Sequence, residues 1–263
     1  MKKRKNVSIK TVFTFLVITL LVITSCENNK DPEAPQLPPE SSFAIDFSDF
    51  STDKSLNLTP DTKTNWFWSA VAISYWNLAV TVTMALPVAS FYESFNHEAI
   101  YEKDGNYWTW TYNVLGSYKA VLKGSIEGDS AVWNMSIDNF EWYNGKSALD
   151  RTGGNWKLKK SPVENEYWLN IVWHKSGDDE GNIRYTNIMQ SDTMYTSYIE
   201  YGMTTTGDYN RYYNLYGADK DNLVNIEWNN PEFNGRVKSS KIPAYSEWQC
   251  WDEYQTDIVC PGN

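Results

Sequence analysis

A carboxylate and a guanidinium in two neighbouring predicted strands are the residues most able to do chemistry. If these strands form a hairpin, Glu200 falls opposite Arg211. On an exposed face such a cross-strand ion pair contributes well under ~1 kcal/mol, whereas on a buried, aromatic-lined face it could hold a ligand. We favour the exposed face, because burying charges is costly. The predicted hairpin joins 196–203 to 209–216 about Thr205 and Thr206, with Tyr198 and Tyr213 as flanking ligand-binding candidates.

Other carboxylates do not specify an active site. Glycoside hydrolysis needs two carboxyl groups roughly 5 to 9.5 Å apart. No Ser-His-Asp order, phosphate loop or zinc-ligand spacing accompanies His97 or His174, which we interpret as surface or capping residues. We therefore expect no catalytic residue, no metal and no cofactor, and we favour a protein that is not an enzyme while leaving that question open. The pairs available on paper are Glu98 with Glu102, Glu164 with Glu166, and Glu200 with Glu227.

Two acidic turns offer oxygen ligands of the kind that calcium prefers, at 178–180 and at Asp219 with Asp221. Neither turn has the spaced ligand pattern of a calcium-binding loop. Solvated turns are the simpler interpretation.

Aromatic residues are unusually abundant, with 13 Trp, 18 Tyr and 10 Phe. Such rings can stack on sugars, but most of them fall on the apolar phase of their strands and are expected in the core. Trp168, Tyr143 and Trp251 fall off that phase or in the C-terminal tail. They complete the set of ligand-binding candidates.

Cys250 and Cys260 are predicted to form a disulfide, because an exported chain meets an oxidising compartment. Two free thiols are the alternative. A metal site is less favoured, because neither histidine lies near a cysteine in the sequence.

The N-terminus has the form of an export signal. Four basic residues at 2–5 precede an apolar stretch at 12–23, which is too short for a comfortable membrane span. The run at 21–26, Leu-Val-Ile-Thr-Ser-Cys, resembles the lipobox cut by bacterial lipoprotein signal peptidase. That resemblance implies a signal peptide at 1–25 and a diacylglycerol thioether on Cys26, with a further acyl chain such as palmitate on its amine. An uncleaved signal anchor is the alternative.

Charge narrows the range of partners. The formal net charge is −10, and removing 1–25 takes away five basic groups and no acidic one, which leaves −15. Such a chain lacks the basic face that nucleic-acid binding requires. It also lacks a polybasic patch for anionic lipid, so we expect attachment to a membrane through acyl chains alone.

The mature chain is expected to hold a tether and one domain. Residues 26–42 carry four prolines and few apolar side chains, which predicts a semi-extended tether reaching about 50 Å at ~3.1 Å per residue. The single β-rich domain is expected at 43–263.

A long uncharged stretch opens this domain. No charged residue lies between Asn65 and Tyr92, and alanine and large apolar side chains alternate around the whole circumference of a helix. We predict a helix over about 64–86 that ends or kinks at Pro87 and is buried on nearly all sides. A transmembrane helix and a pair of strands are the alternatives.

From residue 106 onward the pattern changes to short alternating segments separated by turn residues such as Asp104-Gly105, Asn144-Gly145 and Gly207-Asp208. Around eleven strands are predicted, as an antiparallel meander. So many strands curl rather than stay flat. We therefore expect a mainly β (α+β) fold, in which a barrel or strongly curved half-barrel surrounds the apolar helix. A β-sandwich with a packed helix is the alternative.

Segments 198–202, 224–229 and 248–260 look like those of uncharacterised outer-membrane lipoproteins of the Bacteroidota, and the likeness covers most of the mature chain. It implies a cell-envelope location, periplasmic or surface-exposed, and a β-rich domain, but no activity. The sequence thus predicts a non-catalytic ligand-binding or envelope-assembly domain, with a glycan or an envelope protein as partner. A glycan-binding or glycan-cleaving surface protein is the alternative.

Overall fold

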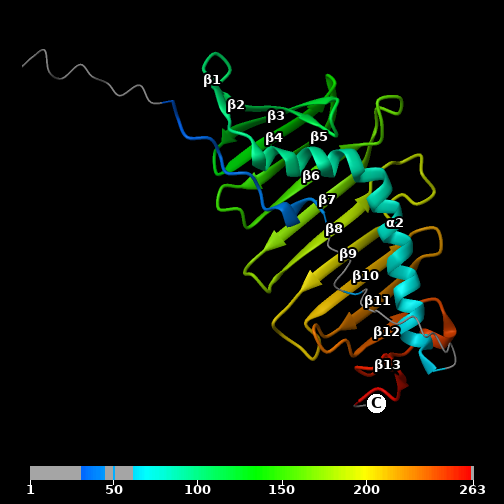
Figure 1. Cartoon of the computed structure of the whole chain (residues 1–263). Helices are drawn as coiled ribbons and strands as arrows, with labels where there is room; N and C mark the ends of the chain where they lie inside the picture. Colours follow the sequence, from blue (N-terminus) through cyan, green and yellow to red (C-terminus); the bar gives the residue numbers. More distant parts are fainter. Residues whose placement is uncertain (1–30, 45–49, 51–61, 262–263) are drawn as a thin grey trace, which may run out of the picture. The chain divides into compact units, whose positions relative to one another are not determined.

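The computed structural model describes residues 31–44, 50 and 62–261. Its strands, in chain order, are β1 (Ile100–Glu102), β2 (Tyr107–Val114), β3 (Tyr118–Glu127), β4 (Ser130–Ile137), β5 (Phe140–Ala148), β6 (Gly153–Lys159), β7 (Tyr167–Lys175), β8 (Gly181–Asn187), β9 (Tyr198–Met203), β10 (Arg211–Gly217), β11 (Asn222–Trp228), β12 (Gly235–Ser239), β13 (Gln249–Trp251) and β14 (Asp257–Ile258). All 14 strands form one sheet in which each pairs antiparallel with the next (Figure 1).

This arrangement confirms the predicted mainly β fold, an antiparallel meander with a single long helix among the described residues. Within that part of the chain, β1 pairs only with β2 and β14 only with β13. The sheet is therefore open, and the closed-barrel form of the prediction is wrong.

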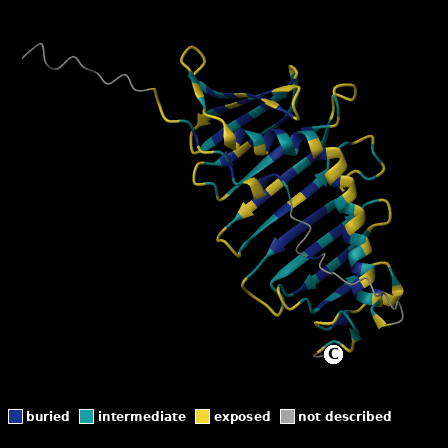
Figure 2. Ribbon diagram, in the orientation of Figure 1, coloured by how far each residue is buried: buried dark blue, intermediate teal, exposed yellow. Residues whose placement is uncertain are grey.

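One face of the sheet carries the core. In β4 the residues alternate strictly between half-buried and buried, so that Ala131, Trp133, Met135 and Ile137 point to one side. The same alternation recurs along the sheet, as the bands of buried residues in Figure 2 show. We call this the inner face, and the opposite side of the sheet the outer face. The buried aromatic residues of the inner face are Trp108, Trp110, Tyr112, Trp133, Tyr143, Trp156, Trp173, Tyr185, Tyr201, Tyr213, Trp228 and Trp251.

The long helix α2 (Thr64–Glu93) lies across the inner face and contacts β2 at one end and β12, β13 and β14 at the other. Its 30 residues give a length of about 45 Å, close to the roughly 48 Å spanned by ten strand spacings. At its N-terminus the backbone N–H groups of Thr64 and Asn65 both donate to the Asp257 carboxylate at 3.0 Å. Near its other end the Tyr112 hydroxyl donates to the Ser90 carbonyl at 2.5 Å.

The helix begins at Thr64, where the sequence predicts it, but continues through Pro87 to Glu93. Its predicted burial on nearly all sides is wrong. Trp66, Met84 and Phe91 face the sheet, whereas Tyr75 and Leu78 on the opposite side are 69% and 66% exposed. An open sheet offers a helix only one face, so only the facing stripe is buried. By length and composition, residues 64–96 could also cross a membrane.

Residues 34–44 are packed against the sheet and the helix, which corrects the predicted tether for this part of 26–42. Residues Ala34–Asn263 form one compact unit, in which Pro35 and Pro38 are buried. The Phe43 ring stacks on Phe91 with centroids 4.9 Å apart, and the Phe43 carbonyl accepts a hydrogen bond from the Tyr185 hydroxyl at 3.1 Å. A proline-rich composition did not prevent packing, because Phe43 provides an apolar anchor for the segment. Cys26 and the signal region lie outside the described residues.

The predicted disulfide is confirmed. Cys250 in β13 is bonded to Cys260, just after β14, and the two Cα atoms lie 5.1 Å apart. The Asn65 side-chain amide donates to the Cys250 carbonyl at 3.1 Å. The bridge therefore holds together the end of the sheet against which α2 begins.

Candidate functional site

The outer face holds a buried carboxylate at its centre. Glu200 in β9 lies opposite Arg184 in β8 and Asn214 in β10, and is only 6% exposed. Its two carboxylate oxygens accept hydrogen bonds from Asn182 at 2.9 Å, Arg184 at 2.8 Å and Asn214 at 3.2 Å. The Asn225 amide then donates to the Asn214 oxygen at 2.7 Å and continues the network to β11.

The environment of Glu200 keeps it ionised. Burial raises its pKa, but the hydrogen bonds from Arg184, Asn182 and Asn214 and the charge of Arg184 outweigh it, so the pKa lies below the usual value. Tyr212 lies beside this cluster. Burial, together with the charge of Glu200, raises the pKa of the Tyr212 hydroxyl. A general acid for glycoside cleavage needs a raised carboxyl pKa. Glu200 has the opposite shift, which does not suit it to act as that general acid.

The predicted pairing of Glu200 with Arg211 is wrong. In the observed hairpin Arg211 lies opposite Met203, and Glu200 opposite Asn214. The loop is centred on Gly207, which has a φ of +95°, and not on the threonines before it. That left-handed conformation suits glycine, so the Gly207-Asp208 pair was the signal that located the turn. Glu200 does lie on the outer face, but its neighbours bury it and its ion-pair partner is Arg184, so the expected exposed pair with Arg211 does not form.

The other predicted ligand-binding residues separate into two groups. Tyr198 lies on the outer face, where the Arg184 guanidinium sits 4.4 Å from its ring centroid. Tyr213, Tyr143 and Trp251 are no more than 1% exposed and belong to the core, so the expectation that they could stack on a ligand is wrong. Trp168 is half-buried and packs against the core.

A polar pocket of about 400 Å³ lies where three hairpin loops meet. The loops after β7, β9 and β11 share one end of the sheet, because alternate hairpins of a meander turn at the same end. Thr205 in the second loop donates to Glu180 in the first. We use the term polar pocket for the site lined by Asp179, Thr204, Thr205, Gly207, Tyr209, Asn210, Arg211, Asn229 and Asn230.

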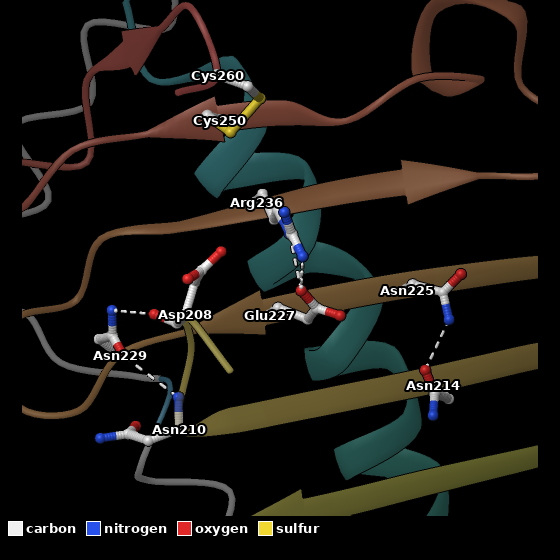
Figure 3. Close-up of polar contacts among 9 residues, drawn as sticks. All are labelled: Asp208, Asn210, Asn214, Asn225, Glu227, Asn229, Arg236, Cys250 and Cys260. Carbon is white, nitrogen blue, oxygen red and sulfur yellow. Dashed lines mark hydrogen bonds and ion pairs between the residues drawn. A yellow bond between two sulfur atoms is a disulfide. The ribbon is translucent and has the colours of Figure 1, made fainter. Parts of the chain in front are cut away.

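The asparagines of the polar pocket hold its shape. The Asn210 side chain donates to the Asn230 carbonyl and accepts from the Asn230 N–H, both at 2.9 Å. The Asn229 side-chain oxygen accepts from the Asn210 N–H at 3.2 Å, and its amide donates to the Asp208 carbonyl at 3.1 Å (Figure 3). These bonds join two loops into a rigid frame. The side-chain amides of Asn210 and Asn229 are therefore occupied in holding the loops together. The other functional groups in the wall of the polar pocket are the Asp179 carboxylate, the Arg211 guanidinium and the Tyr209 phenol.

Next to the polar pocket, an arginine lies between two aromatic rings. The Arg236 guanidinium is 4.2 Å from the Trp248 centroid and 4.9 Å from that of Tyr209. It also donates to the Glu227 carboxylate at 2.7 and 2.6 Å. Figure 3 shows this pair in front of the sheet, with α2 behind it. We call Tyr209, Arg236 and Trp248 the Arg236 stack; it shares Tyr209 with the polar pocket.

A second outer-face cluster surrounds Glu141 in β5. It accepts hydrogen bonds from Asn134, Tyr167 and Lys159, at 2.5, 2.9 and 3.2 Å respectively. Burial raises the pKa of Glu141, but these hydrogen bonds and the Lys159 charge outweigh burial and lower it overall. The Asn144 amide also donates to this carboxylate at 3.3 Å. Carboxylates at two distant places on the outer face are thus held as charged network centres.

The remaining predicted features have ordinary surroundings. Glu164 forms an exposed ion pair with Lys160, and His97 stacks on Tyr112. In the part of the chain that the structure describes, no group of three or more His, Cys, Asp or Glu side chains could hold a metal ion. A second cavity, of about 320 Å³, lies on the inner face between the N-terminal segment and β7 to β9, with Trp173, Ile183 and Tyr201 in its wall.

No protein-family model, no curated protein and no solved structure matches this chain.

Proposed function

We propose that this protein is a lipoprotein of the bacterial cell envelope whose β domain binds carbohydrate at the polar pocket without cleaving it. The anchor in this proposal is the acylated Cys26, and the location is the outer membrane. What supports the binding role is the wall of the polar pocket, which combines a phenol ring at Tyr209, a guanidinium at Arg211 and a carboxylate at Asp179.

Sugars match such a wall. Their hydroxyl pairs bind to planar charged groups, and their C–H faces pack on aromatic rings. The volume of about 400 Å³ falls within the ~300 to 1,000 Å³ of small-ligand sites. The asparagine frame preorganises the loops, which lowers the entropy that binding must overcome.

The absence of turnover is proposed from the state of the carboxylates. Glu200 and Glu141 both have lowered pKa values, because their hydrogen bonds and the charges of Arg184 and Lys159 outweigh the effect of burial. Neither can supply the proton that glycoside cleavage needs near neutral pH.

Binding is tested with the full-length protein in mild detergent, on an array of envelope and dietary polysaccharides followed by calorimetry on the best binder. Tyr209→Ala removes the ring of the polar pocket and is expected to weaken binding at least tenfold. Tyr254→Ala is the matched control, because Tyr254 is 71% exposed in the β13–β14 loop. Equal binding by both variants would contradict the assignment of the site.

The same preparation tests the alternatives. New reducing ends on incubation with a bound polysaccharide would overturn the non-catalytic part of the proposal. Absence of any glycan binding, together with crosslinking to one envelope protein, would replace carbohydrate binding with an assembly role. Mass spectrometry of the N-terminal peptide, with Cys26→Ala as control, tests the diacylglycerol anchor.

A further inference from the structure

The side of α2 that faces away from the sheet carries an unpartnered apolar stripe. Its members are 45 to 69% exposed and are spaced four, four, three and four residues apart. At 3.6 residues per turn they fall within a sector of about 80°, on the side opposite the buried residues. We call this set the α2 stripe: Phe67, Val71, Tyr75, Leu78 and Val82.

The helix that carries the α2 stripe contains no charged residue between its two ends. Lys63 precedes the helix and Glu93 ends it, and every residue between them is uncharged. The exposed neighbours of the stripe are Ser, Thr and Ala. A contiguous apolar surface of this kind marks a contact with a partner or a membrane in most soluble proteins.

The length and exit point of the N-terminal chain indicate which partner this is. Only seven residues separate Cys26 from Ala34, so the eight steps from one Cα atom to the next reach at most about 29 Å at ~3.6 Å per step. Ala34 and Leu37 pack against the core, and Phe43 stacks on Phe91 of α2 itself. The chain that leads from the acylated cysteine therefore joins the domain on its inner-face side, near the C-terminal end of α2.

We infer that the α2 stripe lies in the lipid–water interface of the membrane that holds Cys26, with the outer face and the polar pocket directed toward solvent. This inference rests on the lipid anchor of the proposed function. The chain from Cys26 onward has a net charge of −15, which gives no attraction to anionic lipid, so the contact is apolar and insensitive to salt. The helix stays on the sheet, because Trp66, Met84 and Phe91 on its other side are part of the core.

A second copy of the chain is the rival occupant. Two copies could bury the stripe against each other, but a dimer would not use the short anchor chain. The membrane is the partner that a seven-residue tether already brings within reach of the domain.

The test places one fluorescent label on each side of the domain. The acylated full-length protein is reconstituted into phosphatidylcholine vesicles, and Leu78→Cys is labelled with an environment-sensitive dye. The label reacts at one position, because Cys26 is a thioether and Cys250 is bonded to Cys260. Val172→Cys is the matched control: Val172 is an apolar residue, 48% exposed, on the outer face of β7.

With lipids brominated near the headgroup, the label at 78 is expected to lose at least half of its fluorescence and the label at 172 to change little. High salt should alter neither result. Stronger quenching by lipids brominated at the chain end would mean that the helix spans the bilayer, and would overturn the inference. Excimer emission from a pyrene at 78 without lipid quenching would identify a second copy as the occupant, and would also overturn it.

Flotation of the same vesicles separates the two proposals. Protein that floats but is not quenched at 78 refutes the interfacial contact and leaves the anchor intact. Protein that does not float refutes the anchor, and the interfacial contact with it.

Discussion

Glu200→Gln should destabilise the domain, because it removes the negative charge and one of the two oxygens that accept hydrogen bonds. One oxygen of Glu200 accepts from Asn182, and the other accepts from both Arg184 and Asn214. The amide keeps the shape of the side chain but replaces one acceptor with an NH₂ group that faces existing donors. Charge-assisted hydrogen bonds contribute about 1.5 to 3 kcal/mol each. Because the Arg184 side chain is 44% exposed and can turn to water, we expect a loss of about 2 kcal/mol.

The loss should depend on pH in a defined direction. The pKa of Glu200 is lowered in the folded protein, so its stabilisation is complete above the unfolded-state pKa of about 4.3. It disappears as the pH falls through the folded-state pKa. The difference in unfolding free energy between the wild type and Glu200→Gln should therefore be largest near pH 7 and shrink below about pH 4.

Urea unfolding of the Ala34–Asn263 unit, followed by tryptophan fluorescence, measures this difference, and the melting temperature should fall by roughly 4 to 8 °C. Glu227→Gln is the control: Glu227 also bonds an arginine, but its side chain is 30% exposed, so about 0.5 to 1 kcal/mol is expected. Equal losses in the two variants, or a Glu200→Gln loss that persists unchanged at pH 3, would refute the reasoning.

Two further changes test the core and the C-terminal bridge. Gly235→Ala would place a Cβ 2.4 Å from the Trp251 ring and 2.5 Å from the Glu227 carbonyl, so we expect the unfolding free energy in urea to fall by about 2 kcal/mol. Gly177→Ala is the control and should change it little, because nothing lies within 4 Å of the added Cβ. Similar urea midpoints for the two variants would contradict the close packing at Gly235. Replacing Cys250 and Cys260 with alanine opens a loop with a sequence separation of 10 and should lower the unfolding free energy by about 3 kcal/mol. The urea midpoint of the double variant, compared with that of the wild type, measures this loss. An unchanged midpoint would show that the bridge does not constrain the unfolded chain.

Local patterns were enough for several elements. The disulfide between Cys250 and Cys260 was predicted from the export signal, because an exported chain meets an oxidising compartment. The short alternating segments from residue 106 onward predicted strands, and β4 shows the corresponding alternation of buried side chains. This alternation is a signal over a few residues, where side-chain direction dominates. The helix start at Thr64 was of the same kind.

Other features depend on distant partners. The register between Glu200 and its neighbours required the centre of the loop to be known, and an error in the loop moved the opposing residue from Asn214 to Arg211. Arg184, the observed partner of Glu200, comes from the preceding strand and was not a predicted site residue. The polar pocket collects residues from three hairpins, and their meeting at one end follows from the strand order alone.

Local sequence patterns are sufficient to predict the meander of short strands and the uncharged helix, and the export signal predicts that the two cysteines pair. The open sheet, the one-sided burial of α2 and the packing of Phe43 against the core depend on contacts between distant parts of the chain. Periodicity and composition report the preference of each segment for burial. Which of its sides is buried depends on the surfaces that the rest of the chain provides, and those exist only once the sheet has formed.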